Sequence, residues 1–340
     1  MRIKAFEWSN YRRMPDGGID VRNNIVLVGP NDSGKSSLLR AMHIALGMAH
    51  GQATSAIRAR DFTDPGAPLK IRVVLDDLKD HDRAAFPDEV TTGPPEELTV
   101  EVEATVDPSD DELVAVRRHF PDGGHNRAPT RVQLETIGFD FVPAARSLLR
   151  ELGEGRGVVH SLLADLDLSA DLPALEAAAT KFKTTLDGST VLGGFRSEVA
   201  TALSGALPKS VVEKDGQLLP QAELLDDPLA GVTVTVSEEG RAVPLSEQSD
   251  GIRAVSVLTL LGMARTTAAI VAIDEPETHL HPAAQRSVAR SLGGDGGQRI
   301  IATHAPAIVG ELDPLDLVAI RADRHVRQLS VGARMSMQET

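Results

Sequence analysis

The sequence contains no cysteine and few aromatic residues. The absence of cysteine excludes a disulfide framework and any thiolate metal site, and it fits a reducing compartment. Aromatic residues make up 3% of the 340 residues, so the core must be mainly aliphatic, and platforms for stacking nucleic acid bases are not expected. Hydrophobic residues at 41% and charged residues at 25% are typical of a folded protein, here with room for about two domains.

The sequence also lacks a membrane-spanning or targeting segment. Its longest apolar stretch, Val255 to Ile273, is interrupted by Arg265 and by threonines, which makes it too polar to cross a bilayer. The first ten residues, MRIKAFEWSN, have no apolar signal region. We therefore expect a cytoplasmic protein that makes no membrane contact.

The sequence has fewer basic than acidic residues. Lys and Arg number 35 against 49 Asp and Glu, which gives a formal net charge of −14. This balance argues against a whole surface that binds nucleic acid or membrane. DNA contact would need a local basic patch, for which Arg58, Arg60 and Arg72 are candidates. Pairing of these arginines with surface carboxylates is the alternative.

Strand patterns dominate the first 145 residues. An apolar run at 25–28 predicts a buried strand, and apolar residues at spacings of three and four from Leu38 to Leu46 predict a helix. Apolar and polar residues alternate at 71–75 and 100–106, and a third such run begins at Val132. The alternation predicts an antiparallel sheet with one face in solvent.

The pattern changes after residue 145. Helical spacing of leucine and alanine predicts a helical insertion at 146–228. Farther on, buried strands predicted at 268–273 and 299–302 alternate with helices, which is typical of a parallel α/β core. We therefore divide the chain into two lobes of one domain, 1–145 and 229–340, with the insertion between them.

The residues from Gly29 to Ser36, GPNDSGKS, match the phosphate-loop pattern G-x-x-x-x-G-K-S. An apolar strand precedes them and an amphipathic helix follows, as such a loop requires. The glycines allow backbone N–H groups to face a polyphosphate at a helix N-terminus. Lys35 can reach the β- and γ-phosphates, and the Ser36 hydroxyl can bind Mg²⁺. The alternative, a chance glycine loop, does not explain this context.

Two acidic residues, Asp274 and Glu275, end the apolar run at 268–273. Residues at the carboxyl edge of a parallel sheet face the ligand crevice. There Asp274 would help to hold Mg²⁺ through a water molecule, and Glu275 would orient or deprotonate the attacking water. A solvated acidic turn, with Glu277 close by, is the alternative. The phosphate loop earlier in the chain favours the functional interpretation.

Two further segments are candidates for nucleotide contact. The strand predicted at 299–302 ends in Thr303-His304, and the imidazole there could sense a γ-phosphate; an ordinary surface histidine is the alternative. In LSEQSDGI, Ser249 can cap a helix N-terminus and Gly251 permits close backbone approach. This makes a second anion site, suited to a nucleotide on another subunit. An ordinary capped helix is the alternative.

These four elements, in this order, resemble the ABC-type ATPases of the RecF, Rad50 and SMC group. The resemblance rests on GPNDSGKSS, the signature-like LSEQSDG, the Walker B segment IVAIDEPETHLHP and the switch segment ATHAP. Within that group the sequence is most similar to the ATPase of the overcoming-lysogenisation-defect (OLD) family. FVPAAR at 141–146 and the histidine-rich end of the Walker B segment favour this assignment.

The resemblance implies an α/β fold: a P-loop ABC-type ATPase head with a mostly parallel core sheet, an antiparallel β subdomain and a helical insertion. It implies ATP and Mg²⁺ as cofactors and a homodimer around two ATP, with the insertion as dimerisation domain. The Walker A residues would be Gly29, Asn31, Ser33, Gly34, Lys35, Ser36 and Ser37. The other site residues would be Arg12 on phosphate, Ser36 and Asp274 on Mg²⁺, Glu275 and His304 in catalysis, and Ser249 and Gly251 acting in trans.

The sequence departs from the family pattern in several places. Asp32 stands where glycine is usual, the signature is not LSGGQ, and Phe141-Val142-Pro143 occupies the position of the glutamine loop. The residues after His304 are too few for the TOPRIM nuclease domain that relatives often carry. We expect no nuclease activity from this chain, which is either an ATPase working with a separate TOPRIM nuclease or the ATPase portion of a longer protein.

Several functions remain open. The first is an ATPase head that controls a DNA-processing or antiphage nuclease, and the second is a standalone RecF-like DNA repair ATPase. A transporter ATPase is disfavoured by the missing glutamine loop. A non-hydrolysing ATP sensor is disfavoured by Glu275, because a sensor has less need of a base.

Overall fold

The computed structural model describes most residues of one compact unit, Met1–Arg150 with Gln248–Thr340, which we call the head, and fewer residues of the rest of the chain. The described residues are 1–142 except 92, 124 and 125; 170–191; 235–238; 241–244; 247–248; 252; 256; and 270–328 except 279 and 294–296. The chain divides into two compact units, Met1–Arg150 with Gln248–Thr340, and Glu151–Glu247. The predicted boundaries after residues 145 and 228 stay predictions.

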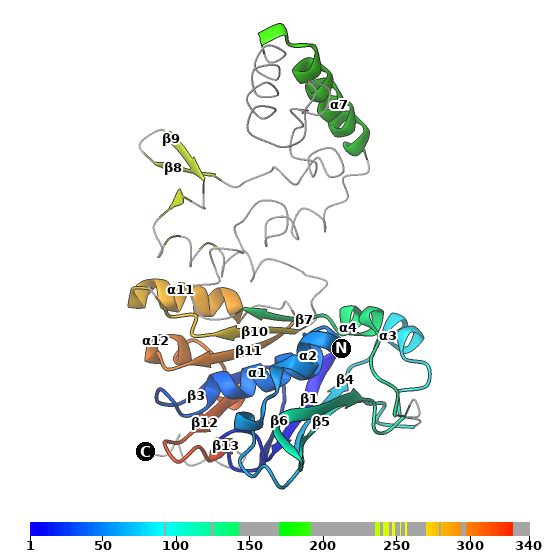
Figure 1. The fold of residues 1–340 in the computed structure, drawn as a ribbon. Coiled ribbons are helices and arrows are strands. Elements are labelled where there is room, and N and C mark those ends of the chain that lie inside the picture. The colour runs from blue at the N-terminus through cyan, green and yellow to red at the C-terminus, as the bar shows by residue number, and fades with distance from the viewer. Residues whose placement is uncertain are drawn as a thin grey trace, which may run out of the picture. The chain divides into compact units, whose positions relative to one another are not determined.

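The first unit contains an antiparallel sheet (Figure 1). Its described strands lie in the order β2 (Gly17–Asp20), β1 (Arg2–Ser9), β4 (Leu69–Asp76), β5 (Leu98–Asp107) and β6 (Asp110–His119). Along β4, Leu69, Ile71, Val73 and Leu75 are fully buried, and the residues between them are partly or fully exposed. The alternating sequence pattern therefore forms the antiparallel sheet that it predicts.

The second sheet of this unit is mostly parallel. Its described strands lie in the order β13 (Val326–Gln328), β12 (Leu317–Ile320), β3 (Ile25–Val28), β11 (Gln298–Thr303), β10 (Ile270–Asp274) and β7 (Phe139–Val142). Only β13 pairs antiparallel with its neighbour among these strands. In the central register Asp274 lies beside Ala302 and Thr303 beside Val28. The carboxyl ends of β3, β10 and β11 therefore meet at one edge.

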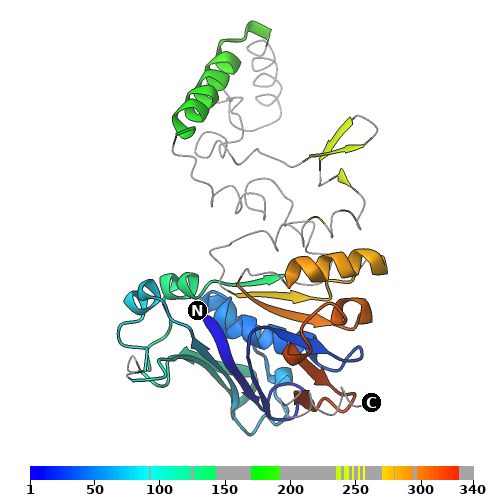
Figure 2. The same cartoon turned by 180° about the vertical axis from the view of Figure 1, so that it is seen from behind.

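Helix α1 (Lys35–Leu46) packs against strands of both sheets, as Figures 1 and 2 show from opposite sides. Its sequence, KSSLLRAMHIAL, carries apolar residues on more than one face, and eight of its twelve residues are buried. A helix that is apolar around most of its circumference is suited to a place between two layers. The head is thus an α/β fold with the phosphate-loop helix at its centre.

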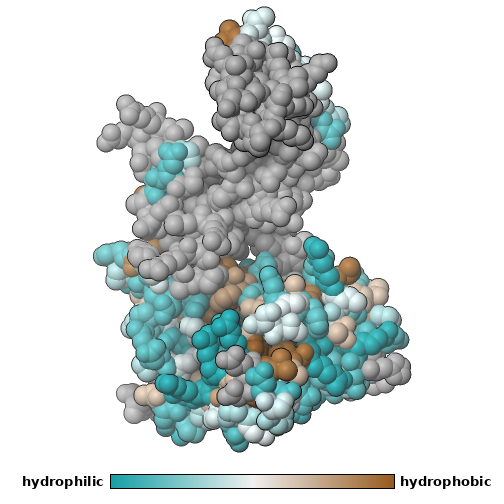
Figure 3. Space-filling view, in the orientation of Figure 1, coloured by the Kyte–Doolittle hydropathy of each residue, from teal (hydrophilic) through white to brown (hydrophobic). Residues whose placement is uncertain are grey.

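Shorter elements complete the head. They are α2 (His50–Ala56), the 3₁₀ turn η1 (Ala59–Asp61), α3 (Asp80–Ala85), α4 (Arg131–Ile137), α11 (Pro282–Leu292), α12 (Pro306–Val309) and η4 (Pro314–Asp316). Helices α11 and α12 contact each other. On the face seen in Figure 3 the head is mainly hydrophilic, in line with the burial of its aliphatic side chains.

Two buried polar side chains tie the layers together. The Gln298 amide of β11 accepts a hydrogen bond from the Ile3 backbone N–H (2.7 Å) and donates to the Ile3 carbonyl (2.9 Å) in the other sheet. Arg118 of β6, 1% exposed, donates to the carbonyls of Ile44 (3.1 Å) and Met48 (2.7 Å) at the end of α1. Burial lowers the pKa of Arg118 to about 10, so its charge still complements the helix C-terminus at neutral pH.

One predicted strand is wrong. The run beginning at Val132 and Leu134 forms helix α4. Thr130 caps this helix: its hydroxyl accepts from the Gln133 N–H, and the Gln133 side chain accepts from the Thr130 N–H. This capping box fixes the first turn as helix, and Gly138 with φ 63° ends it.

In the second unit the structure describes α7 (Leu172–Gly188), β8 (Thr235–Glu238) and β9 (Arg241–Pro244). Helix α7 lies within the predicted helical insertion, and β8 pairs antiparallel with β9. Much of the predicted helical insertion lies outside the described residues. Among the described residues, no helix combines the length and the apolar character needed to cross a membrane.

Candidate nucleotide site

The phosphate loop connects β3 to α1, and its glycines are required by close packing. Gly34 has φ 109°, and a Cβ there would lie 2.2 Å from the Met14 sulfur. A Cβ on Gly29 would lie 2.3 Å from the Ile320 carbonyl oxygen. Because real Cβ atoms do not approach other atoms so closely, both positions require glycine for the loop to keep this shape.

Lys35 is held inside the loop. Its side chain is buried, with 4% of the residue exposed, and Nζ donates to the carbonyl oxygens of Gly29 (2.9 Å) and Pro30 (2.8 Å). Both hydrogen-bond partners are neutral carbonyl groups, so neither of them balances the charge of the Lys35 ammonium. A phosphate placed in the loop would supply the opposite charge.

Ser36 and Asp274 join two segments that are far apart in the sequence. The Ser36 hydroxyl at the start of α1 donates to Asp274 Oδ1 at the end of β10 over 3.1 Å. Burial raises the pKa of Asp274, and the hydrogen bond from Ser36 and the charge of Lys35 act in the opposite direction. A partly buried carboxylate beside a hydroxyl is a suitable pair for a hard cation such as Mg²⁺.

Glu275 follows directly and turns away from the strand. Its backbone adopts φ 48°, and its N–H donates to the Ala302 carbonyl over 2.8 Å. A positive φ is uncommon for a residue with a side chain, and such conformations cluster at functional sites. The turn brings Glu275 to the cavity that the phosphate loop also lines.

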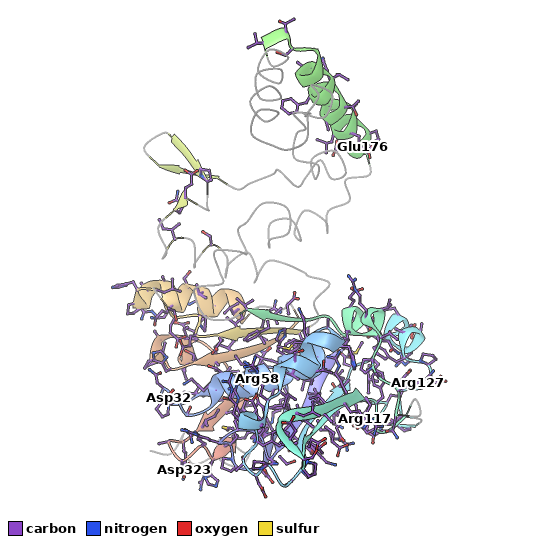
Figure 4. The ribbon with its side chains drawn as sticks, in the orientation of Figure 1. Asp32, Arg58, Arg117, Arg127, Glu176 and Asp323 are labelled. Atoms are coloured by element: carbon purple, nitrogen blue, oxygen red, sulfur yellow. The ribbon has the colours of Figure 1, made fainter. Side chains whose placement is uncertain are left out.

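This cavity has a volume of about 1400 Å³. Predicted site residues among its lining are Arg12, Asn31, Gly34, Lys35, Ser36, Ser37 and Glu275. Three arginines that the sequence analysis did not assign to the site also line it, Arg13, Arg60 and Arg324. The Arg324 Nε donates to the Asp32 carbonyl over 3.4 Å, so the turn at Asp323 lies near the loop tip at Asp32, as Figure 4 shows. The excess of positive charge suits a polyphosphate.

Arg12 reaches the site from the turn after β1. Its Nη1 donates to Ser37 Oγ (3.0 Å), and its Nε donates to Asp61 Oδ1 (2.8 Å). The contact with Ser37 links this turn to α1. Of the other basic candidates, Arg72 pairs with Asp122 (2.8 Å), which matches the surface-pairing alternative.

Four predicted site residues in the described part of the chain are not among the residues that line the cavity: Gly29, Ser33, Asp274 and His304. Ser33 is 1% exposed, and its hydroxyl has no hydrogen-bond partner within the described part of the chain. His304 follows β11, and its side chain is 46% exposed. Its backbone N–H donates to Glu277 Oε1 (2.8 Å), and its Nδ1 lies 2.9 Å from the same oxygen. The predicted site residues Ser249 and Gly251 lie outside the described residues.

The contact between Glu277 and His304 was not predicted from the sequence. The available signal was an acid two residues after Glu275, in the segment DEPET. In the described part of the chain, no three His, Cys, Asp or Glu residues are grouped to hold a metal ion. A Mg²⁺ at Ser36 and Asp274 would therefore take its remaining ligands from phosphates and water, the arrangement this ion favours with nucleotides.

The fold is that of a P-loop ABC-type ATPase head. The chain belongs to the AAA domain family described as "AAA domain, putative AbiEii toxin, Type IV TA system", whose pattern matches residues 25–310. No curated protein sequence matches the chain.

Solved structures of SMC heads share the fold. One, an Smc head bound to the C-terminal winged-helix domain of ScpA, is 15% identical with a TM-score of 0.60, covering 98% of this chain and 100% of that one. Another, an Smc head with an extended coiled coil bound to the C-terminal domain of ScpA derived from Pyrococcus furiosus, is 14% identical with a TM-score of 0.56. That alignment covers 99% of this chain and 98% of the other. At these identities the likeness concerns the fold alone.

Proposed function

We propose that this chain binds ATP with Mg²⁺ and hydrolyses it. The observation that carries the proposal is the hydrogen bond between Ser36 and Asp274 (3.1 Å). It joins the phosphate-loop helix to the acidic strand end, and Glu275 lines the cavity beside it. Membership of the AAA domain family supports the same activity.

Each residue has a distinct part in the proposed reaction. Lys35 would exchange its two carbonyl partners for the β- and γ-phosphates, where its charge offsets charge developed during phosphoryl transfer. Ser36 and Asp274 would hold Mg²⁺, which neutralises phosphate charge when bound. Glu275 would orient the attacking water and accept its proton. His304 would donate a hydrogen bond to the terminal phosphate.

The active form in this proposal is a homodimer around two ATP molecules. Ser249 and Gly251 of the signature-like segment would contact the partner's nucleotide, since a helix N-terminus can bind the terminal phosphate. The similarity of the fold to SMC heads supports a head of this type. Arg12 would contribute to phosphate binding through its position beside Ser37.

The proposed downstream role is control of a DNA-processing or antiphage nuclease, as in an OLD-type protein. The sequence motifs support this role, with a TOPRIM nuclease either separate or fused. A standalone RecF-like DNA repair ATPase is the second candidate, favoured by the same motifs and by the several arginines that line the cavity. DNA would then bind at a local basic site and not through the net charge.

The direct test is phosphate release from ATP by the purified full chain, with and without Mg²⁺. We expect turnover that depends on Mg²⁺ and is absent in Lys35→Ala, which should also lose nucleotide binding in calorimetry. An exposed lysine such as Lys70, 47% exposed at its side chain, gives a control in Lys70→Ala with unchanged turnover. Tight ATP binding by the wild type without turnover would favour the sensor alternative.

A further inference from the structure

Glu277 is a buried carboxylate that the proposed reaction does not yet use. It lies in the turn after β10, and 6% of the residue is exposed. Glu275 lines the nucleotide cavity, whereas Glu277 is absent from its lining. Glu277 therefore needs an explanation other than direct contact with nucleotide.

The contacts of Glu277 converge on the turn that follows β11. Oε2 accepts a hydrogen bond from the Thr303 hydroxyl (2.8 Å). Oε1 accepts from the His304 backbone N–H (2.8 Å) and lies 2.9 Å from His304 Nδ1. The Thr303 hydroxyl in turn accepts from the Ala305 N–H (3.0 Å). One carboxylate thus holds both the backbone and the ring of the histidine.

A buried carboxylate adds little to the stability of the fold, because the free-energy cost of removing it from water opposes the gain from its contacts. Its usual value next to a functional histidine is to fix the tautomer and the orientation of the ring. With Nδ1 beside Glu277, Nε2 is the ring nitrogen available to a ligand. The exposed position of the His304 side chain leaves the ring accessible.

We propose that Glu277 is a positioning residue that accepts a hydrogen bond from Nδ1–H of His304 and thereby directs Nε2 to the terminal phosphate of bound ATP, to which Nε2 donates once it carries a proton as well. This inference rests on the proposed function for its effect on turnover, but its effect on the ring does not require turnover. A plain structural role, in which Glu277 only holds the turn through Thr303, is the competing explanation.

The kinetic test is a double-mutant cycle in the full chain. Glu277→Ala should lower kcat about 10-fold to 100-fold with little change in ATP affinity. In a His304→Ala background the same change should cause no further loss, because Glu277 acts through that ring. Glu277→Gln, which keeps an acceptor oxygen, should recover part of kcat. Losses that multiply in the double variant would overturn the proposal.

The control is another paired carboxylate of the same unit. Glu311 pairs with Arg290 (2.9 Å) and is more exposed, so Glu311→Gln should keep the wild-type kcat. Thermal unfolding of each variant identifies any that fail to fold. Glu277→Gln keeps the shape of the side chain and serves if the alanine variant is unfolded.

The test that is independent of turnover measures the His304 ring directly. Nitrogen NMR at mildly alkaline pH, with the His304 signals identified by their loss in His304→Ala, reports which nitrogen carries the proton. We expect Nδ1 in the wild type and a shift towards Nε2 in Glu277→Ala. In the ATP-free wild type, a ring protonated on Nε2 and not on Nδ1 would overturn the proposal. Failure of the wild type to hydrolyse ATP would instead refute the proposed function and leave the ring result valid.

Discussion

At the scale of single residues, Glu275 carries the sharpest prediction. Glu275→Gln keeps the size of the side chain but removes the base, so ATP should still bind while turnover falls about 100-fold or more. Single-turnover kinetics with ATP binding measured in parallel checks this. Turnover close to wild type in a variant that binds ATP would remove Glu275 from the role of base.

Asp274 gives the site a pH dependence. Since burial raises its folded-state pKa, the protonated form favours folding, and this contribution is lost as pH rises through the raised value. Bound Mg²⁺ requires the ionised form and offsets that loss. Mg²⁺ and nucleotide should together raise the Tm of the protein. We expect this increase in Tm to be larger at pH values above the ordinary pKa range of an Asp carboxyl and smaller at pH values below it. A Tm increment that is the same on both sides of this range would contradict the assignment.

The local part of the site could be predicted from sequence, and the rest depended on tertiary contacts. The phosphate loop is one contiguous pattern, and Asp274 and Glu275 are marked by the apolar strand before them. Glu277 could not be assigned in the same way, because its partners Thr303 and His304 lie on another strand end. The three unassigned arginines of the cavity come from separate turns, which only the folded chain brings together.

At the scale of elements, the phosphate loop depends on the space around its first glycine. Gly29→Ala would place a methyl group 2.3 Å from the Ile320 carbonyl, so β12 or the loop must shift at a cost of about 1–3 kcal/mol. We expect lower stability in denaturant unfolding and weakened nucleotide binding.

A matched control is available in α2. Nothing lies within 4 Å of a Cβ on Gly51, and alanine favours a helix by about 0.5–1 kcal/mol over glycine. Gly51→Ala should therefore be neutral or slightly stabilising. Equal losses in the two variants would show that crowding at Ile320 is not the cause.

Apolar runs and periodicity predicted the phosphate-loop strand and helix, two strands of the antiparallel sheet and two further core strands, and periodicity failed where a cap decided the structure. Helix α1 has the expected apolar spacing, and β4 and β5 have the expected alternation. Val132 and Leu134 fit a strand equally well by spacing, but the reciprocal hydrogen bonds of Thr130 and Gln133 select a helix. Short strands such as β7 and β13 gave too few residues for a period to be recognised.

At the scale of the whole molecule, the proposed dimer predicts association that depends on ATP. Glu275→Gln should trap bound ATP, so its molar mass in light scattering after gel filtration should double when ATP and Mg²⁺ are present. Adding Ser249→Arg should prevent the doubling without loss of ATP binding, because the signature-like segment would act only in trans. A monomer at saturating ATP would contradict the dimer.

The amide of Gln298 has a consequence for how the head can move. The amide forms hydrogen bonds with both the N–H and the carbonyl of Ile3. Sliding one sheet past the other would leave these buried donors and acceptors without partners, and each unpaired group would cost about 1–3 kcal/mol of stability. The two sheets should therefore move together as a rigid body. If ATP binding or hydrolysis causes a conformational change, we expect the moving segments to lie outside the two sheets. Hydrogen exchange at the Ile3 amide should then stay slow both with and without ATP.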